Sequence, residues 1–169
     1  IEETKPVQPF VTIGISLIKN SSRFEWFLEK ATEIGVNEIL PMICERTEKE
    51  KFKSERMQQI LINAMLQSQQ SWLPNMHEPI QLKDLLRTTY SSKMIAHCND
   101  DEKQLIPQSD VNNDCLLLIG PEGDFSKSEI DAAISNGFKA VSLGNTRLRT
   151  ETAGIVGAAL LCARRILRS

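Results

Sequence analysis

Hydrophobic and polar positions in the first part of the chain predict a strand, a helix and a second strand. Residues 11–18 (VTIGISLI) form a β-branched apolar run of strand length. The polar residues 20–22 can cap a following helix, and Gly35 stands where a left-handed residue would end it. Between them, apolar residues recur at helical spacing: Phe24, Phe27, Leu28, Ala31 and Ile34. Residues 36–44 (VNEILPMIC) predict a strand in which Pro41 marks an irregularity.

The middle of the chain predicts one long amphipathic helix and several shorter elements. The helix begins near Ser54, because apolar residues on one face oppose glutamine and asparagine on the other. Its apolar face consists of Met57, Ile60, Leu61, Ala64 and Met65. Beyond Pro74, residues 83–88 are expected to form a short helix and residues 93–97 a short strand. Residues 100–114 are expected to form a polar loop.

The segment from residue 115 onward has the clearest pattern. Residues 115–119 (CLLLI) form a continuous apolar run, which is typical of a strand covered on both faces in a parallel sheet. The run leads into a glycine-containing loop at residues 120–123. Ser126 and Glu129 have the spacing of a capping box at the start of a helix, and Gly137 is placed to end that helix.

Another strand and helix complete the chain, and together the elements indicate the fold class. Residues 140–143 are expected to form a strand, followed by a second loop at residues 144–150 and a helix from about 151 to 167. Strands that alternate with helices predict an α/β fold. We expect a mainly parallel sheet with helices on both of its faces.

The last predicted helix is apolar on nearly all sides, so it needs more cover than one sheet face supplies. Gly154, Gly157 and Ala158 are small enough to let another backbone approach closely. Two interpretations remain open at this point. Either the core of the same chain surrounds the helix, or a second subunit packs against it.

Composition favours one ordinary globular domain. The chain has 169 residues, of which 41% are hydrophobic and 25% charged, and it carries a formal net charge of −2. We expect one domain over residues 11–169, and residues 1–10, with Pro6 and Pro9, to be the remnant of a linker from an upstream domain. The charge gives no overall basic surface, which argues against a free-standing nucleic-acid binder.

Cysteine and histidine usage argues against disulfides and metal centres. The four cysteines are scattered, and three of them, Cys44, Cys115 and Cys162, lie in apolar runs. We therefore expect reduced thiols and a cytoplasmic protein. No second ligand accompanies either histidine in the sequence, so no metal site is expected. No apolar stretch is long enough to suggest a membrane span.

Two loops could carry chemistry. In the loop at residues 120–123 (GPEG), glycine lets a ligand lie directly against backbone amides, although a tight turn with no ligand would use the same residues. The loop matches neither the phosphate-binding P-loop nor the dinucleotide fingerprint. In the second loop, Thr150 could cap the next helix and Glu151 could favour its positive end. Arg149 stands just before a buried helix start, where an arginine is usually paired or bound to an anion such as an RNA backbone, and either Arg147 or Arg149 could have this functional role.

Both loops follow strands, and ligands bind beyond the carboxyl ends of strands in open α/β sheets. We therefore expect the two loops to face one site.

Three motifs in these segments resemble a known family. They are KATEIGV at residues 30–36, IGPEGDFS at residues 119–126 and LGNTRLRTETA at residues 143–153. Their order and spacing, from about residue 11 to the end, resemble the RsmE family of ribosomal RNA small subunit methyltransferases, which belongs to the SPOUT superfamily. The resemblance implies a trefoil knot in the C-terminal segment and S-adenosylmethionine bound in the knot. It also implies a homodimer, with methylation of ring nitrogen 3 of a uridine in 16S ribosomal RNA within the small ribosomal subunit.

The resemblance also assigns residues to the two parts of the site. The S-adenosylmethionine cradle would comprise Ile119, Gly120, Pro121, Glu122, Gly123, Leu143, Gly144, Leu148, Thr150, Thr152 and Ala153. Arg149 would stabilise negative charge on the uridine or hold RNA phosphate, and Glu151 would orient the base or relay its proton. Which of the two acts as the general base stays open.

The chain departs from the family pattern at several places. Asp124 stands where the family commonly has a second glycine. Leu66, which precedes the expected Gln67, stands where glutamate is expected, and Gln70 stands where arginine is expected. We expect the N-terminal β-barrel of the family, which is similar to PUA domains, to be missing from this sequence. Two alternatives therefore remain: a SPOUT methyltransferase that acts on transfer RNA, and a non-catalytic S-adenosylmethionine-binding or RNA-associated dimerisation module.

Overall fold

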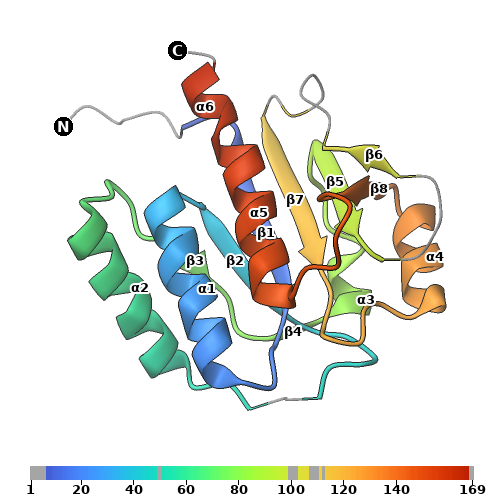
Figure 1. Cartoon of the computed structure of the whole chain (residues 1–169), viewed down its shortest axis with the longest axis horizontal. Helices are drawn as coiled ribbons and strands as arrows, with labels where there is room; N and C mark the ends of the chain where they lie inside the picture. Colours follow the sequence, from blue (N-terminus) through green and yellow to red (C-terminus); the bar gives the residue numbers. More distant parts are fainter. Residues whose placement is uncertain (1–6, 49–50, 99–102, 107–110, 112, 168–169) are drawn as a thin grey trace.

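A parallel sheet forms the centre of the molecule (Figure 1). The computed structural model describes residues 7–48, 51–98, 103–106, 111 and 113–167. Within them the sheet has eight strands in the order β3-β2-β1-β7-β5-β8-β6, with β4 also paired to β2, and every pairing is parallel. The strands are β1 (Phe10–Ser16), β2 (Glu38–Ile43), β3 (Asn75–Met76), β4 (Ile80–Gln81), β5 (Ser92–Ala96), β6 (Gln104–Leu105), β7 (Asp114–Ile119) and β8 (Lys139–Ser142).

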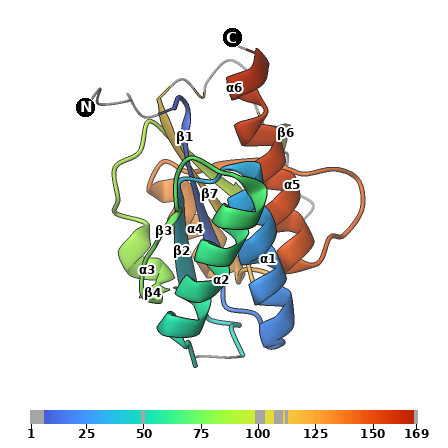
Figure 2. The same cartoon turned by 90° about the vertical axis from the view of Figure 1, so that its left-hand side faces the viewer.

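Helices cover both faces of this sheet. They are α1 (Ser21–Ile34), α2 (Ser54–Ser68), α3 (Leu82–Leu85), α4 (Lys127–Ser135), α5 (Thr150–Cys162) and α6 (Arg164–Leu167). Helices α1, α2 and α5 lie on one face, and α3 and α4 lie on the other (Figures 1 and 2). The predicted α/β architecture, with a parallel sheet and helices on both faces, is confirmed.

Alternation along the central strands explains the two layers of core. Successive strand residues point to opposite faces, so Leu117 of β7 packs into the core beneath α1 and α5, while Leu116 and Leu118 pack into the core beneath α3 and α4. All three leucines are fully buried. The continuous apolar run from residue 115 therefore reflects a strand covered on both faces, as the sequence predicts.

The ends of α1 and α4 follow the predicted caps. The side chain of Asn20 accepts a hydrogen bond from the amide of Ser22 at the start of α1. Gly35 ends that helix in the left-handed conformation, with φ of 101°. At α4, Ser126 and Glu129 form both hydrogen bonds of the predicted capping box.

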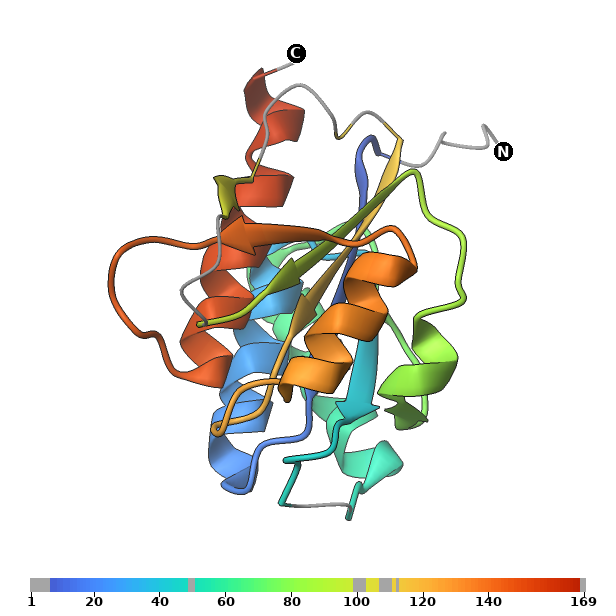
Figure 3. The same ribbon diagram turned by 90° about the vertical axis from the view of Figure 1, so that its right-hand side faces the viewer.

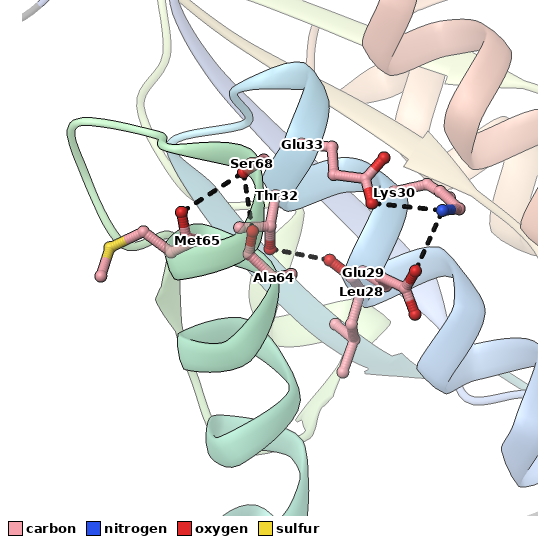
Figure 4. A network of polar contacts seen from close by, with 8 residues as sticks. All are labelled: Leu28, Glu29, Lys30, Thr32, Glu33, Ala64, Met65 and Ser68. Atoms are coloured by element: carbon pink, nitrogen blue, oxygen red, sulfur yellow. Dashed lines mark hydrogen bonds and ion pairs between the residues drawn. The ribbon is translucent and has the colours of Figure 1, made fainter.

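Several polar side chains of α1 and α2 bond within their own helices (Figure 4). Lys30 donates to Glu29 and Glu33 of the same helix, at 3.0 and 3.2 Å. Thr32 Oγ1 donates to the Leu28 carbonyl at 2.8 Å, and Ser68 of α2 donates back to Ala64 and Met65. The charged part of the KATEIGV motif thus lies on a helix surface and contributes no side chain to a cavity.

Pro41 lies inside β2, at a break in the pairing on one side of that strand. It pairs with Ile15 of β1 on the inner side. On the outer side, β3 pairs with residues 38–39 and β4 with residues 42–43, so the outer pairing is interrupted around the proline. A residue without an amide proton fits such an interruption, which confirms the predicted irregularity.

Two expectations about the second half are wrong. The single helix expected over residues 151–167 ends at Cys162, and a short separate helix, α6, follows Ala163. The break is accompanied by contacts to distant segments, since Arg165 donates to the carbonyls of Pro9 and Gly35. Strand β6 lies within the expected polar loop, of which residues 100–102, 107–110 and 112 are outside the described residues.

The small residues of α5 face the core of the same chain. A Cβ added at Gly154 would lie 2.7 Å from Cε2 of Phe27, and one at Gly157 would overlap Leu117. The core interpretation of these glycines is therefore confirmed. On the opposite side of the helix, Leu160 is 47% exposed, so the residues that the structure describes leave this side partly open.

The cysteines lie as predicted. Cys44, Cys115 and Cys162 are buried and Cys98 is exposed, and all four are free thiols. Burial raises the pKa of Cys44 and Cys115 to about 12 and that of Cys162 to about 11, so these three thiols stay protonated at neutral pH.

Candidate functional site

A cavity of about 550 Å³ opens at the carboxyl ends of three neighbouring strands, β5, β7 and β8. It is lined by residues 96–98, 119–122 and 141–151, together with Arg23, Lys103, Asp124 and Ala153. Because the strands are parallel, the segments that follow them meet at the same edge of the sheet. The two motif loops therefore line one cavity, as their positions after strands predict.

A buried hydrogen bond ties the two loops to each other. Thr150 Oγ1 donates to the carbonyl of Gly120 at 2.9 Å, across 30 residues of sequence. The prediction that Thr150 caps the helix is wrong, because Arg149 is the N-cap residue and Thr150 is the first residue of α5. The threonine hydroxyl is instead directed to the other loop, which fixes the distance between the two walls of the cavity.

Other segments hold the rest of the first loop. The carboxylate of Glu122 accepts from the amide of Lys19, which follows β1, at 3.0 Å. Arg46, which follows β2, donates from Nη1 to the carbonyl of Gly123 at 2.8 Å. The first loop is thus held from two further strand ends before any ligand binds.

The two glycines of the cavity serve different needs. A Cβ at Gly120 would lie 3.0 Å from Cδ2 of Phe125, so close packing of that ring requires a small residue there. Gly144 has φ of 136°, a conformation that L side chains rarely adopt, and the space beside it is open within 4 Å. Gly144 therefore leaves backbone accessible to a ligand.

The charged residues of the second loop differ in their surroundings. This segment, between β8 and α5, forms a wide loop at the edge of the molecule (Figure 3). Arg147 and Arg149 are exposed, and their side chains form no hydrogen bond or ion pair with any residue that the structure describes. Glu151 is buried at the cavity wall, where its carboxylate lies 3.7 Å from Nε of Arg23 on α1. The site therefore combines unpaired cations at its rim with a paired carboxylate inside.

Most of the residues singled out in the sequence reach the cavity. Arg149 and Glu151 line it, and so do Ile119, Gly120, Pro121, Glu122, Leu143, Gly144, Leu148, Thr150 and Ala153. Gly123 and Thr152 are not among the lining residues. Gly123 lies instead against Arg46, on the outer side of its turn.

Sequence reasoning missed several lining residues. Residues 96–98 could have been found, because they lie at the carboxyl end of a predicted strand of the same parallel sheet. Arg23 and Lys103 had no such signal, since only the packing of distant segments brings them to the cavity. The described residues contain no group of three or more histidine, cysteine, aspartate or glutamate side chains that could hold a metal ion. Among them there is also no helix with the length and apolar character needed to cross a membrane.

Comparison with known proteins places the site in a family context. The model of the RNA methyltransferase domain matches residues 4–162. A ribosomal RNA small subunit methyltransferase E from Mesomycoplasma hyopneumoniae (strain 232) is 34% identical over 152 residues, which cover 86% of this chain and 66% of that protein. The chain spans between about half and two thirds of the length of the curated relatives that it matches first.

Two solved structures are also similar. A probable rRNA-methyltransferase from Porphyromonas gingivalis has a TM-score of 0.90 and 38% identity, covering 98% of this chain and 72% of that one. A ribosomal RNA small subunit methyltransferase E from Neisseria gonorrhoeae, bound to S-adenosyl methionine, has a TM-score of 0.83 and 31% identity, covering 90% of this chain and 65% of that one.

Proposed function

The chain belongs to the RsmE family of ribosomal RNA small subunit methyltransferases, and we propose that it transfers a methyl group from S-adenosylmethionine to ring nitrogen 3 of a uridine in 16S ribosomal RNA. The observation that carries this proposal is the single cavity between the two motif loops, which are joined by the bond from Thr150 to Gly120. Its volume of about 550 Å³ lies within the usual range for small-molecule sites. The names of the relatives favour ribosomal RNA over transfer RNA.

We assign the methyl donor to the two motif loops. The proposed donor-binding residues are Ile119, Gly120, Pro121, Glu122, Gly123, Leu143, Gly144, Leu148, Thr150, Thr152 and Ala153. Support comes from the nine of them that line the cavity and from the accessible backbone at Gly144. Gly123 and Thr152 would act indirectly. Gly123 would shape the turn of the first loop, and Thr152 would shape the first turn of α5.

Arg149 and Glu151 are the proposed residues for the uridine. Bound S-adenosylmethionine supplies a methyl group that is already activated by a sulfonium, so the protein must mainly remove the proton from the ring nitrogen and align the two reactants. The guanidinium of Arg149 lies at the cavity with no partner in the described chain, and it can stabilise negative charge on the deprotonated ring. The buried carboxylate of Glu151 can orient the base or accept its proton.

The open side of the C-terminal helices supports a homodimer. Leu160, Ile166 and Leu167 are 47%, 76% and 75% exposed, and large apolar residues exposed together favour a protein interface. We propose that two copies of the chain pack along α5 and α6. This interface would lie close to the cavity, because the first turn of α5 lines the cavity. A cytoplasmic location and a substrate within the small ribosomal subunit follow from the proposed activity. The trefoil knot stays a prediction.

The proposal is tested first by calorimetric titration with S-adenosylmethionine and S-adenosylhomocysteine. We expect saturable binding of both, close to one per chain. A folded protein that binds neither would contradict the proposal.

Replacing Arg149 separates the donor site from the uridine site. We expect Arg149→Ala to bind S-adenosylmethionine with unchanged affinity, while transfer of a labelled methyl group to 16S ribosomal RNA falls about 100-fold, the usual cost of one lost charge-stabilising donor. Arg87→Ala is the matched control, because Arg87 is also exposed but does not line the cavity. Equal transfer rates in the two variants would refute the role of Arg149.

A further inference from the structure

Asp124 occupies an unusual position beside the cavity. Its φ of 65° lies in the left-handed region, which residues other than glycine rarely adopt. It ends a tight turn in which its amide donates to the carbonyl of Pro121 at 2.9 Å. The turn alone would be served as well by glycine, so the side chain of Asp124 calls for an explanation of its own.

Both oxygens of the Asp124 carboxylate accept hydrogen bonds from backbone amides. Oδ1 accepts from the amide of Phe125 at 2.8 Å, within the same loop. Oδ2 accepts from the amide of Cys98 at 2.9 Å, 26 residues away in sequence. The carboxylate therefore joins the loop that follows β7 to the segment that follows β5.

The hydrogen bond between Cys98 and Asp124 lies beyond the residues of β5 that pair with β7. The last residue of β5 that pairs with β7 is Ala96, opposite Ile119. Cys98 lies two residues farther on, and both Cys98 and Asp124 line the cavity. The wall of the cavity formed by residues 97 and 98 thus depends on a contact beyond the strand ladder, and the Asp124 carboxylate supplies one.

We propose that Asp124 is a positioning residue for the methyl donor: its carboxylate fixes the end of β5 as one wall of the donor site. This inference rests on the proposed function, because it takes the cavity to be the S-adenosylmethionine site. Asp124 acts through the backbone of Cys98 and takes no part in the reaction itself. Its removal should therefore weaken donor binding and leave the rate at saturating donor unchanged.

Two substitutions separate the carboxylate from the backbone conformation. Asp124→Gly keeps the left-handed turn, which glycine adopts without strain, and removes both acceptors. Asp124→Asn keeps the size of the side chain and tolerates the same conformation, but it offers one acceptor oxygen instead of two. Asp131→Asn is the matched control, since Asp131 is an exposed carboxylate on α4 that does not line the cavity.

The exposed thiol of Cys98 reports on the wall directly. Cys98 is the exposed cysteine, whereas the other three of the four are buried, so Ellman's reagent should label Cys98 selectively in the folded protein. We expect the labelling rate without ligand to rise in Asp124→Gly, to rise less in Asp124→Asn and to stay unchanged in Asp131→Asn. Equal rates in all variants and wild type would show that the carboxylate does not hold this segment.

Donor binding then tests the functional part of the inference. We expect the dissociation constant and the donor KM to rise about tenfold in Asp124→Gly, the effect of losing one hydrogen bond to a charged group, with an intermediate rise in Asp124→Asn. The turnover at saturating donor should stay at the wild-type value, whereas partial unfolding would lower turnover without changing KM. Wild-type affinity in a folded Asp124→Gly variant would overturn the inference. Failure of the wild-type protein to bind the donor would instead overturn the proposed function.

Discussion

Replacing Thr150 by valine tests whether the two loops must be joined for the site to form. Valine has the shape of threonine but no hydroxyl, so the substitution removes the 2.9 Å bond to the Gly120 carbonyl and little else. Thr150 is only 5% exposed, so water cannot easily replace the lost donor. Leaving a buried acceptor without its partner costs about 1–3 kcal/mol. We therefore expect the free energy of unfolding to fall by about 2 kcal/mol, a considerable part of the usual 5–15 kcal/mol of a domain.

The matched control is Thr150→Ser, which keeps the hydroxyl and loses one methyl group, at a cost of about 1 kcal/mol. Urea unfolding measures the stability of the three proteins, and calorimetry measures their affinity for S-adenosylmethionine. We expect valine to weaken donor binding several-fold and serine to leave it close to wild type, because only serine can still donate to Gly120. If the valine variant is as stable as the serine variant and binds the donor equally well, the bond does not organise the site.

Three further predictions concern the fold. Gly157→Ala should lower the free energy of unfolding by about 1–2 kcal/mol in urea, because the added Cβ would overlap Leu117 and overpacking outweighs the helix propensity of alanine. Arg165→Lys should lower it by about 2 kcal/mol, because lysine cannot reproduce the hydrogen bonds of the guanidinium to separate backbone carbonyls or its stacking 5.4 Å from the Trp72 ring. Burial raises the pKa of Cys115 from 9.0 to about 12, so its contribution to stability is complete below pH 9 and is lost as the pH rises toward 12. Between pH 9 and pH 10 wild type should therefore lose about 1 kcal/mol more than Cys115→Ala, measured by urea unfolding at both values.

The sequence predicts best those elements whose stabilising contacts are periodic or local. Strand β7 is visible as an apolar run because both of its faces are buried, and α4 is visible because Ser126 and Glu129 form their capping box within one turn. Strands β3, β4 and β6 have two residues each, too few to show any alternation. They form because each pairs with the edge of a longer strand, which is β2 for β3 and β4 and β8 for β6. The break after α5 cannot be predicted from the neighbouring residues, because Arg165 bonds to carbonyls of residues far away in the chain.

In the candidate site too, the sequence predicts continuous segments but not the contacts between distant segments. Both motif loops are continuous segments that follow predicted strands, so the sequence could place them at one edge of the sheet. The partner of Glu151 could not be predicted, because Arg23 approaches it from a helix more than 120 residues earlier. The sequence alone shows Asp124 as a departure from the family pattern. Its bond to Cys98 became apparent only from the tertiary structure.

The parallel sheet explains why the first loop can be held so completely. Lys19, Arg46 and Cys98 follow β1, β2 and β5, and each forms a hydrogen bond to residues 122–124. Since all these strands run in the same direction, their carboxyl ends reach the same loop. Folding itself therefore orders the first loop. Donor binding then does not have to supply the conformational entropy of ordering that loop, which is about 1–2 kcal/mol per residue. The guanidinium of Arg149, in contrast, has no partner among the described residues, so on the proposed function we expect its side chain to become ordered when RNA binds. If the proposed function holds, we expect such a site to take up the donor first and to adapt to the RNA afterwards.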